Sequence, residues 1–176
     1  MLPDSSLPNS PEPLPLPRYS AGLFRPRSPK RIMADKKRVL ILCTGNSARS
    51  QMAEGLLRHD SGDRFEVFSA GTNPGHVRPE AVTVMRELGI DISSHRSKHV
   101  DEFQGQPFDY VLTVCDNAKG NCPFFPGTVT LHHSFQDPAA FAGAETDRLV
   151  LFRRVRDELR QYLRTFPPPP IPSPLR

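Results

Sequence analysis

A cysteine, an arginine and a serine follow an apolar run near residue 40. Cys43 ends the run at residues 39–42, five residues separate it from Arg49, and Ser50 comes next. We expect the backbone N–H groups of residues 44–49, the anion loop, to converge on a tetrahedral oxyanion that the Arg49 fork also binds. These donors also stabilise a thiolate, so the expected pKa of Cys43 is well below that of free cysteine. Ser50 would donate to the sulfur. The expected substrate-binding residues are Thr44, Gly45, Asn46, Ser47, Ala48 and Arg49.

The segments on either side explain why this loop can bind an anion. The preceding run is aliphatic and β-branched, as in a buried parallel strand, and residues 51–58 have the apolar spacing of a helix. A short loop between them lies at the positive end of the helix dipole, and Gly45 lets its backbone bend closely. The alternative is that Cys43 is an ordinary core residue, which leaves Arg49 and Ser50 unexplained.

Two more cysteines follow a second apolar run. Residues 110–114 predict a buried strand that leads into Cys115, and six residues with almost no large apolar side chain separate Cys115 from Cys122. Parallel strands end at one edge of an open sheet, so we expect Cys115 beside the anion loop. The small, polar spacer would allow the two cysteines to form a disulfide. Burial without a redox role is one alternative. A zinc site with His132 or His133 is another, although ligand pairs at the usual spacing are lacking.

A candidate general acid follows a short predicted strand at residues 128–132. Protonation of the departing oxygen lowers the barrier to cleavage of a tetrahedral anion. Asp137 precedes Pro138 in the loop after this strand, and we predict that it supplies the proton. The alternative is an Asp-Pro turn without a chemical role.

These motifs resemble those of two related families. The Cys-x5-Arg-Ser motif is similar to that of the low-molecular-weight protein tyrosine phosphatases, and the three cysteines resemble those of thioredoxin-coupled arsenate reductases on the same fold. The second resemblance spans residues 33–166. It implies that Cys43 attacks arsenate, Cys115 displaces arsenite, and Cys122 resolves the disulfide as part of a redox pair with Cys115. It also implies thioredoxin as reductant, phosphate as a competitor, and a role in arsenic resistance and detoxification.

The loop after Asp137 bears on the choice of substrate. Tyrosine phosphatases of this fold usually have an aromatic residue after the Asp-Pro pair, whereas Ala139 and Ala140 stand here and suit a small inorganic ion. The competing function is a phosphomonoesterase in which Cys115 and Cys122 protect against oxidation. A non-enzymatic oxyanion sensor is a third hypothesis, but it would have no use for an activated thiol.

Some family members hold a potassium ion beside the anion loop. The matching positions are Asn46, Glu54, Ser69 and Lys98, and an aspartate is usual at the last. The Lys98 ammonium would repel a monovalent cation and could itself pair with Glu54. We therefore predict a site that needs no potassium, with a solvated surface lysine as the alternative. No cofactor or bound metal is expected.

Alternating strand and helix patterns predict an α/β fold. A second strand is expected at residues 65–70, a helix near residues 79–88, and a long helix that stops at Pro167. Together these elements predict a four-stranded parallel sheet of order 2-1-3-4 with helices on both faces, as in the low-molecular-weight phosphatases. The core positions of the long helix are Leu149, Phe152, Val155, Leu159, Tyr162 and Phe166.

Composition indicates one domain with extensions. The 176 residues are 37% hydrophobic, and we expect Pro-rich segments at 1–34 and 167–176 to be disordered around a catalytic domain at 35–166. The net charge of +4 comes from residues 1–32 and Arg176, so the domain is neutral and nucleic-acid binding is not expected. No stretch suits a signal peptide or a membrane span, so we expect a cytoplasmic monomer whose cysteines serve catalysis.

Overall fold

The computed structural model describes residues 36–120, 125 and 128–168. All of these belong to one of two compact units of the chain, Met33–Arg176. The predicted N-terminal extension, most of the predicted C-terminal tail, and Cys122 lie outside the described residues.

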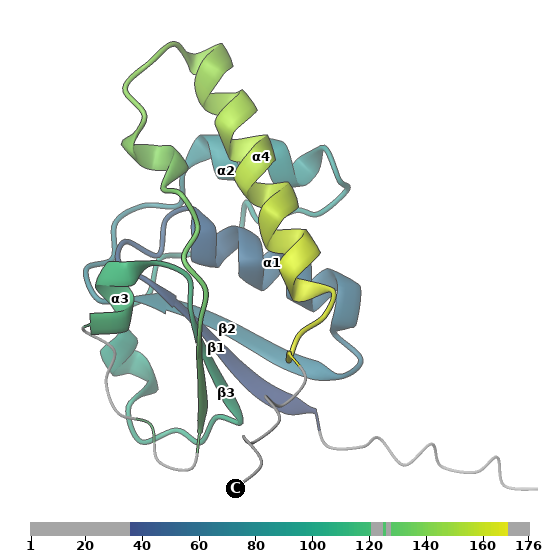
Figure 1. The fold of residues 1–176 in the computed structure, drawn as a ribbon, viewed down its shortest axis with the longest axis vertical. Coiled ribbons are helices and arrows are strands. Elements are labelled where there is room, and N and C mark those ends of the chain that lie inside the picture. Colours follow the sequence, from purple (N-terminus) through teal and green to yellow (C-terminus); the bar gives the residue numbers. More distant parts are fainter. Residues whose placement is uncertain (1–35, 121–124, 126–127, 169–176) are drawn as a thin grey trace, which may run out of the picture. The chain divides into compact units, whose positions relative to one another are not determined.

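Four parallel strands form one sheet in the order β2-β1-β3-β4 (Figure 1). They are β1 (Lys37–Cys43), β2 (Phe65–Gly71), β3 (Tyr110–Thr113) and β4 (Val129–His132). Residues 39–43 of the central β1 are buried, because a parallel strand covered on both faces must be apolar throughout. The predicted fold class and strand order are confirmed.

Long helices pack around the sheet, and shorter helices precede or follow its strands in the chain. The helices α1 (Arg49–Ser61) and α4 (Glu145–Leu163) pack against each other, and α2 (Pro79–Arg86) packs against α4 (Figure 1). The short helix α3 (Asp116–Gly120) begins three residues after the end of β3. Two 3-10 helices, η1 (Val100–Phe103) and η2 (Pro138–Ala140), lie before β3 and after β4 in the chain.

Aromatic contacts mark the two faces of the sheet. Phe65 contacts Phe166, which follows α4, with ring centroids 5.7 Å apart. Phe68 comes three residues later and therefore points to the opposite face of β2, where it contacts Phe103 of η1 at 5.7 Å. The sheet is thus buried on both faces, which agrees with the apolar sequence of β1.

The last helix is shorter than its apolar spacing predicts. It ends at Leu163, one turn before the expected end at Pro167. Phe166 is nevertheless buried, since it reaches Phe65 and Tyr110 from non-helical backbone. A residue that precedes proline is disfavoured in the helical conformation, so the helix does not extend through Phe166.

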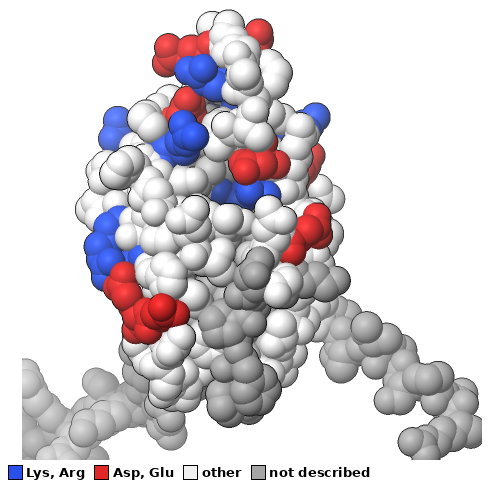
Figure 2. All heavy atoms as spheres, turned by 90° about the vertical axis from the view of Figure 1, so that its left-hand side faces the viewer, with Lys and Arg blue, Asp and Glu red and all other residues white. Residues whose placement is uncertain are grey.

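The surface shows no strong separation of charge on the face viewed in Figure 2. Basic and acidic side chains are interspersed over the described part of that face. Within the described residues, no helix combines the length and the apolar character needed to cross a bilayer.

Candidate active site

A neighbouring segment, residues 72–78, donates hydrogen bonds to carbonyl groups of the anion loop. The carbonyl oxygens of residues 43, 44, 45 and 47 accept hydrogen bonds from the N–H groups of residues 72, 73, 75 and 78 at distances from 2.8 to 3.3 Å. The carbonyl of Asn46 accepts from the side chains of Gln51 and Ser97. Within the described part of the chain, no acceptor is bonded to the N–H groups of Gly45, Ser47, Ala48 or Arg49. These four N–H groups are therefore available as donors, as the predicted binding of an anion requires.

Two residues shape the tight turn of the loop. Asn46 has a φ of 42°, a conformation that asparagine tolerates, and its N–H lies 3.1 Å from the Cys43 sulfur. Gly71 lies behind the loop, where an added Cβ would be 2.4 Å from the Thr44 carbonyl oxygen and 2.8 Å from the Asn46 nitrogen. At Gly45, where the sequence predicts a close bend, an added Cβ would lie 3.1 Å from the Ser47 hydroxyl, so the tighter backbone approach is at Gly71.

Cys43 is almost fully buried, at 2% exposure, at the carboxyl end of β1. The Ser50 hydroxyl lies 2.9 Å from its sulfur. Burial raises the pKa of Cys43 above its ordinary value, although the hydrogen bonds with Ser50 and the charge of Arg49 act to lower it. The predicted low pKa is therefore wrong for this structure. The motif shows which donors surround the sulfur but not how completely the fold excludes water from it.

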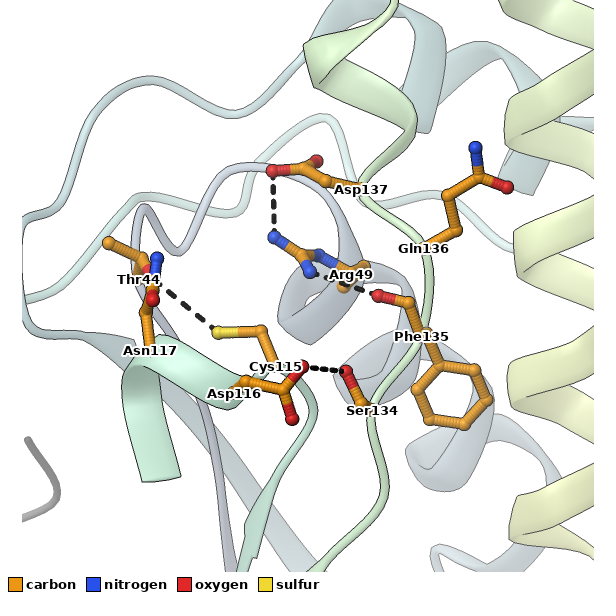
Figure 3. A pocket seen from close by; sticks show the side chains of 9 residues that line it. All are labelled: Thr44, Arg49, Cys115, Asp116, Asn117, Ser134, Phe135, Gln136 and Asp137. Atoms are coloured by element: carbon orange, nitrogen blue, oxygen red, sulfur yellow. Dashed lines mark hydrogen bonds and ion pairs between the residues drawn. The ribbon is translucent and has the colours of Figure 1, made fainter. Parts of the chain in front are cut away.

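Arg49 and Asp137 meet across the site from distant parts of the chain. Arg49 Nη2 lies 2.8 Å from Asp137 Oδ2, and Nη1 donates to the Phe135 carbonyl at 3.0 Å (Figure 3). The other Asp137 oxygen accepts from the Ala139 N–H at 3.0 Å, at the start of η2. The first turn of α1 and the loop after β4 thus place a guanidinium and a carboxylate side by side.

Two cavities share the residues of this pair. One, of ≈ 290 Å³, lies over the anion loop, and the other, of ≈ 480 Å³, opens over Cys115. Both are lined by Thr44, Arg49 and Asp137, and Figure 3 shows these residues in the larger one. The smaller cavity is lined on its other sides by Asn73, Arg78, Ala139 and Ala140.

Cys115 lies next to the anion loop, two residues after the end of β3. Its sulfur is 3.4 Å from the Thr44 hydroxyl, and Thr44 follows Cys43 in the chain (Figure 3). Both cysteines are free thiols at the carboxyl edge of adjacent parallel strands, as the predicted topology requires. Their partner in the predicted relay, Cys122, lies outside the described residues.

A buried polar network lies behind the anion loop and joins Asn46, Glu54, Ser69 and Lys98. The Asn46 amide donates to Ser69 Oγ at 2.8 Å, and that hydroxyl donates to Glu54 Oε2 at 2.5 Å. Lys98 Nζ lies 3.4 Å from the same carboxylate oxygen, and Arg58 binds the other. Only 14% of the Lys98 side chain is exposed. It therefore differs from a solvated surface lysine and lies beside Glu54.

The two adjacent histidines have separate partners. His132 Nε2 lies 3.1 Å from Asp116 Oδ1, and its Nδ1 lies 2.8 Å from the Thr113 hydroxyl. The ring of His133 stacks on Tyr162, with centroids 4.4 Å apart. In the described ranges, no three His, Cys, Asp or Glu side chains gather as they would around a metal ion.

Sequence reasoning missed Asn73 and Arg78, which line the cavity over Cys43. Both belong to the segment at residues 72–78, which the sequence indicates only as a turn that leads into a helix. The signal was its place after a parallel strand, because the carboxyl ends of all such strands share one edge.

Comparisons with known proteins agree with this geometry. Residues 38–167 match the family model for low molecular weight phosphotyrosine protein phosphatases. The chain is 44% identical over 133 residues to an arsenate reductase of Halalkalibacterium halodurans, over 75% of this chain and 96% of that relative. A low molecular weight protein tyrosine phosphatase from T. tengcongensis has a similar structure, with a TM-score of 0.62 and 30% identity over 73% of this chain and 96% of that one. So does a thioredoxin-dependent arsenate reductase of Corynebacterium glutamicum, with a TM-score of 0.53 and 27% identity over 76% of this chain and 64% of that one.

Proposed function

Because the chain belongs to the low-molecular-weight phosphotyrosine protein phosphatase family, we propose that it uses the cysteine-centred oxyanion site of that family to reduce arsenate to arsenite. The observation that carries the proposal is a second thiol beside the anion loop, Cys115, within 3.4 Å of Thr44. Phosphate ester hydrolysis needs one nucleophilic thiol, whereas reduction of a bound oxyanion needs a second thiol that forms a disulfide with the first. The 44% identity to a protein named arsenate reductase supports the same substrate.

In the first step, arsenate binds to the free N–H groups of the anion loop and Cys43 attacks the arsenic atom. The raised pKa means that the thiol still carries its proton when the anion arrives. The thiol and the arsenate dianion form a thiol-bound arsenate and one water molecule. Asp137, which lines the same cavity, takes up the proton released by the thiol and donates it to the departing oxygen.

In the second step, the Cys115 thiol attacks the sulfur of Cys43. The sulfur–arsenic bond breaks, its two electrons pass to arsenic, and a Cys43–Cys115 disulfide forms. The proton of the Cys115 thiol leaves with arsenite. Arsenic is reduced from the pentavalent to the trivalent state and the two thiols are oxidised, so the electrons balance.

In the third step, Cys122 attacks Cys115 and frees Cys43, and thioredoxin reduces the resulting Cys115–Cys122 disulfide. This step rests on the six-residue spacing and on the likeness to a thioredoxin-dependent arsenate reductase. We propose that phosphate competes for the site, since it shares the shape of arsenate. A cytoplasmic monomer that serves arsenic detoxification would fit this chemistry.

A single turnover tests the proposal. Fully reduced protein is mixed with arsenate without a reductant, and intact mass and peptide mapping follow the thiols. We expect one equivalent of arsenite and a loss of two hydrogens that maps to Cys115 and Cys122. Cys122→Ser should stop with a Cys43–Cys115 disulfide after one turnover. Recovery of the arsenate unreduced would overturn the proposal that the protein reduces arsenate.

The second candidate function is a phosphomonoesterase, which Cys43, Arg49 and Asp137 alone would support and which the 30% identity to a solved phosphatase favours. Cys122→Ser distinguishes the two, because it should leave hydrolysis of p-nitrophenyl phosphate unchanged while it abolishes repeated arsenate turnover. Loss of both reactions in Cys43→Ser would exclude a non-enzymatic oxyanion sensor.

A further inference from the structure

We propose that Arg78 is a second anion-binding residue of the cavity over Cys43 and makes that cavity selective for doubly charged oxyanions. The proposal deepens the proposed function, because it names the ionisation state of the arsenate that the site binds. Phosphate has the same shape and the same two ionisation states, so it tests the role of Arg78 without any redox step.

The backbone holds Arg78 in a defined place beside the anion loop. Its N–H donates to the Ser47 carbonyl at 2.8 Å, and Pro79 begins α2 directly after it. Proline at the first helical position restricts the backbone there, so the hydrogen bond and the helix start together fix the position of residue 78. Its side chain lines the same ≈ 290 Å³ cavity as Cys43 and Arg49.

The charges around the cavity single out this side chain. The ionisable groups that line it are Cys43, Arg49, Arg78 and Asp137. The raised pKa keeps Cys43 neutral near pH 7, and Arg49 lies 2.8 Å from Asp137, so their opposite charges largely cancel. The Arg78 guanidinium has no ion pair or hydrogen bond within the described residues.

The acidic residue nearest to Arg78 in the chain does not neutralise it. Glu80 is instead bonded to Arg148, with Arg148 Nε 3.1 Å from Glu80 Oε1. Arg78 therefore supplies the net positive charge of the cavity. A guanidinium also offers two parallel N–H donors, which match two oxygens of a tetrahedral anion.

The charge of Arg78 should make the cavity bind dianions more tightly than monoanions. Phosphate and arsenate lose their second proton near neutral pH, so both forms are present in the cell. The N–H groups of the loop and the Arg49–Asp137 pair carry little net charge, whereas attraction to Arg78 grows with the charge of the ligand. One charge-assisted contact at a partly solvated site corresponds to roughly a tenfold change in affinity.

The test is calorimetric titration of the reduced full-length protein with inorganic phosphate, at about pH 5.5 and about pH 8 on either side of the second ionisation. Arg78→Gln should weaken binding roughly tenfold at the higher pH and about twofold or less at the lower pH. Arg78→Lys keeps the charge without the fork and should fall between. The matched control is Arg86→Gln at the other end of α2, since 66% of that side chain is exposed and it does not line the cavity.

In arsenate turnover, Arg78→Gln should raise KM by about the same factor and change kcat less than about twofold. Equal weakening at both pH values, an equal effect of Arg86→Gln, or no phosphate binding by the wild-type protein would overturn the role of Arg78. If phosphate binding shows the dianion preference but no arsenate is ever reduced, the proposed function fails and the role of Arg78 stands.

Discussion

The Ser50 hydroxyl lies 2.9 Å from the Cys43 sulfur, in a position set by a buried network behind it. The Asn46 amide donates to this hydroxyl at 2.9 Å and to Ser69 at 2.8 Å, and Ser69 in turn bonds Glu54. A continuous chain of side-chain hydrogen bonds therefore joins a buried carboxylate to the nucleophile. We expect changes in this chain to alter the reactivity of Cys43 as well as the shape of the loop.

Ser50→Ala should raise the pKa of Cys43 further. The hydrogen bonds with Ser50 lower this pKa, so their loss leaves burial less opposed and favours the neutral thiol. The alkylation profile of Cys43 should therefore move to higher pH in Ser50→Ala. The measurement is the pH dependence of Cys43 alkylation by iodoacetamide, mapped by mass spectrometry. Ser134→Ala, which removes a hydroxyl bonded to Asp116, should leave the profile in place. An unshifted profile in Ser50→Ala would show that Ser50 does not lower the pKa of Cys43.

Gly71→Ala should displace the anion loop. An added methyl group would lie 2.4 Å from the Thr44 carbonyl oxygen, so the backbone of the loop must move. We expect a loss of about 1–3 kcal/mol in the free energy of unfolding and a larger relative loss of phosphate affinity. Gly75→Ala is the matched control, because no atom lies within 4 Å of its added methyl group. Chemical denaturation and phosphate titration of both variants test this. If they behave alike, the close approach at Gly71 is unimportant.

Activity should not depend on potassium. The Lys98 ammonium already lies 3.4 Å from Glu54, where it would repel another monovalent cation. The arsenate turnover rate should therefore stay constant when potassium replaces choline at fixed ionic strength. A rate that climbs with potassium would show that a cation still binds there.

Lys98→Met should destabilise the fold, since it removes one of two cations from a carboxylate whose side chain is 4% exposed. The expected loss is about 1–3 kcal/mol, as Arg58 still binds Glu54. Lys37→Met removes the exposed pair with Asp109 and should cost at most about 1 kcal/mol. Urea denaturation compares the two, and equal losses would argue against a structural role for Lys98.

The buried thiol should make the protein less stable in alkali. The pKa of Cys43 is raised in the fold, so the folded protein keeps this proton while the unfolded chain loses it above about pH 8.5. The contribution to stability is full below that pH and declines above it, by up to about 1.4 kcal/mol per pH unit. Tyr162, whose pKa is also raised by burial, acts in the same direction. The difference between wild type and Cys43→Ser, measured by denaturation at several pH values, isolates Cys43. Parallel curves would show that the thiol is not protected from ionisation.

Much of the fold could be predicted because its signals are local. The aliphatic run before Cys43 and the helical spacing after Arg49 predicted β1 and α1, and both are present. The Asp-Pro pair after the last strand placed Asp137 near the anion loop, because parallel strands end at one edge of the sheet. The end of α4 was predicted less well, since the apolar spacing continues to Phe166 although the backbone leaves the helix after Leu163.

By itself, the sequence determined which chemical groups are available and the order of the strands that carry them. Residue types are written in the chain, and burial on both faces leaves a clear apolar pattern. Only the tertiary structure decided that Arg49 pairs with Asp137, that Gly71 makes room for the anion loop, and that burial raises the pKa of Cys43. These properties depend on distances between distant segments and on the exclusion of water, which no local pattern of residues records.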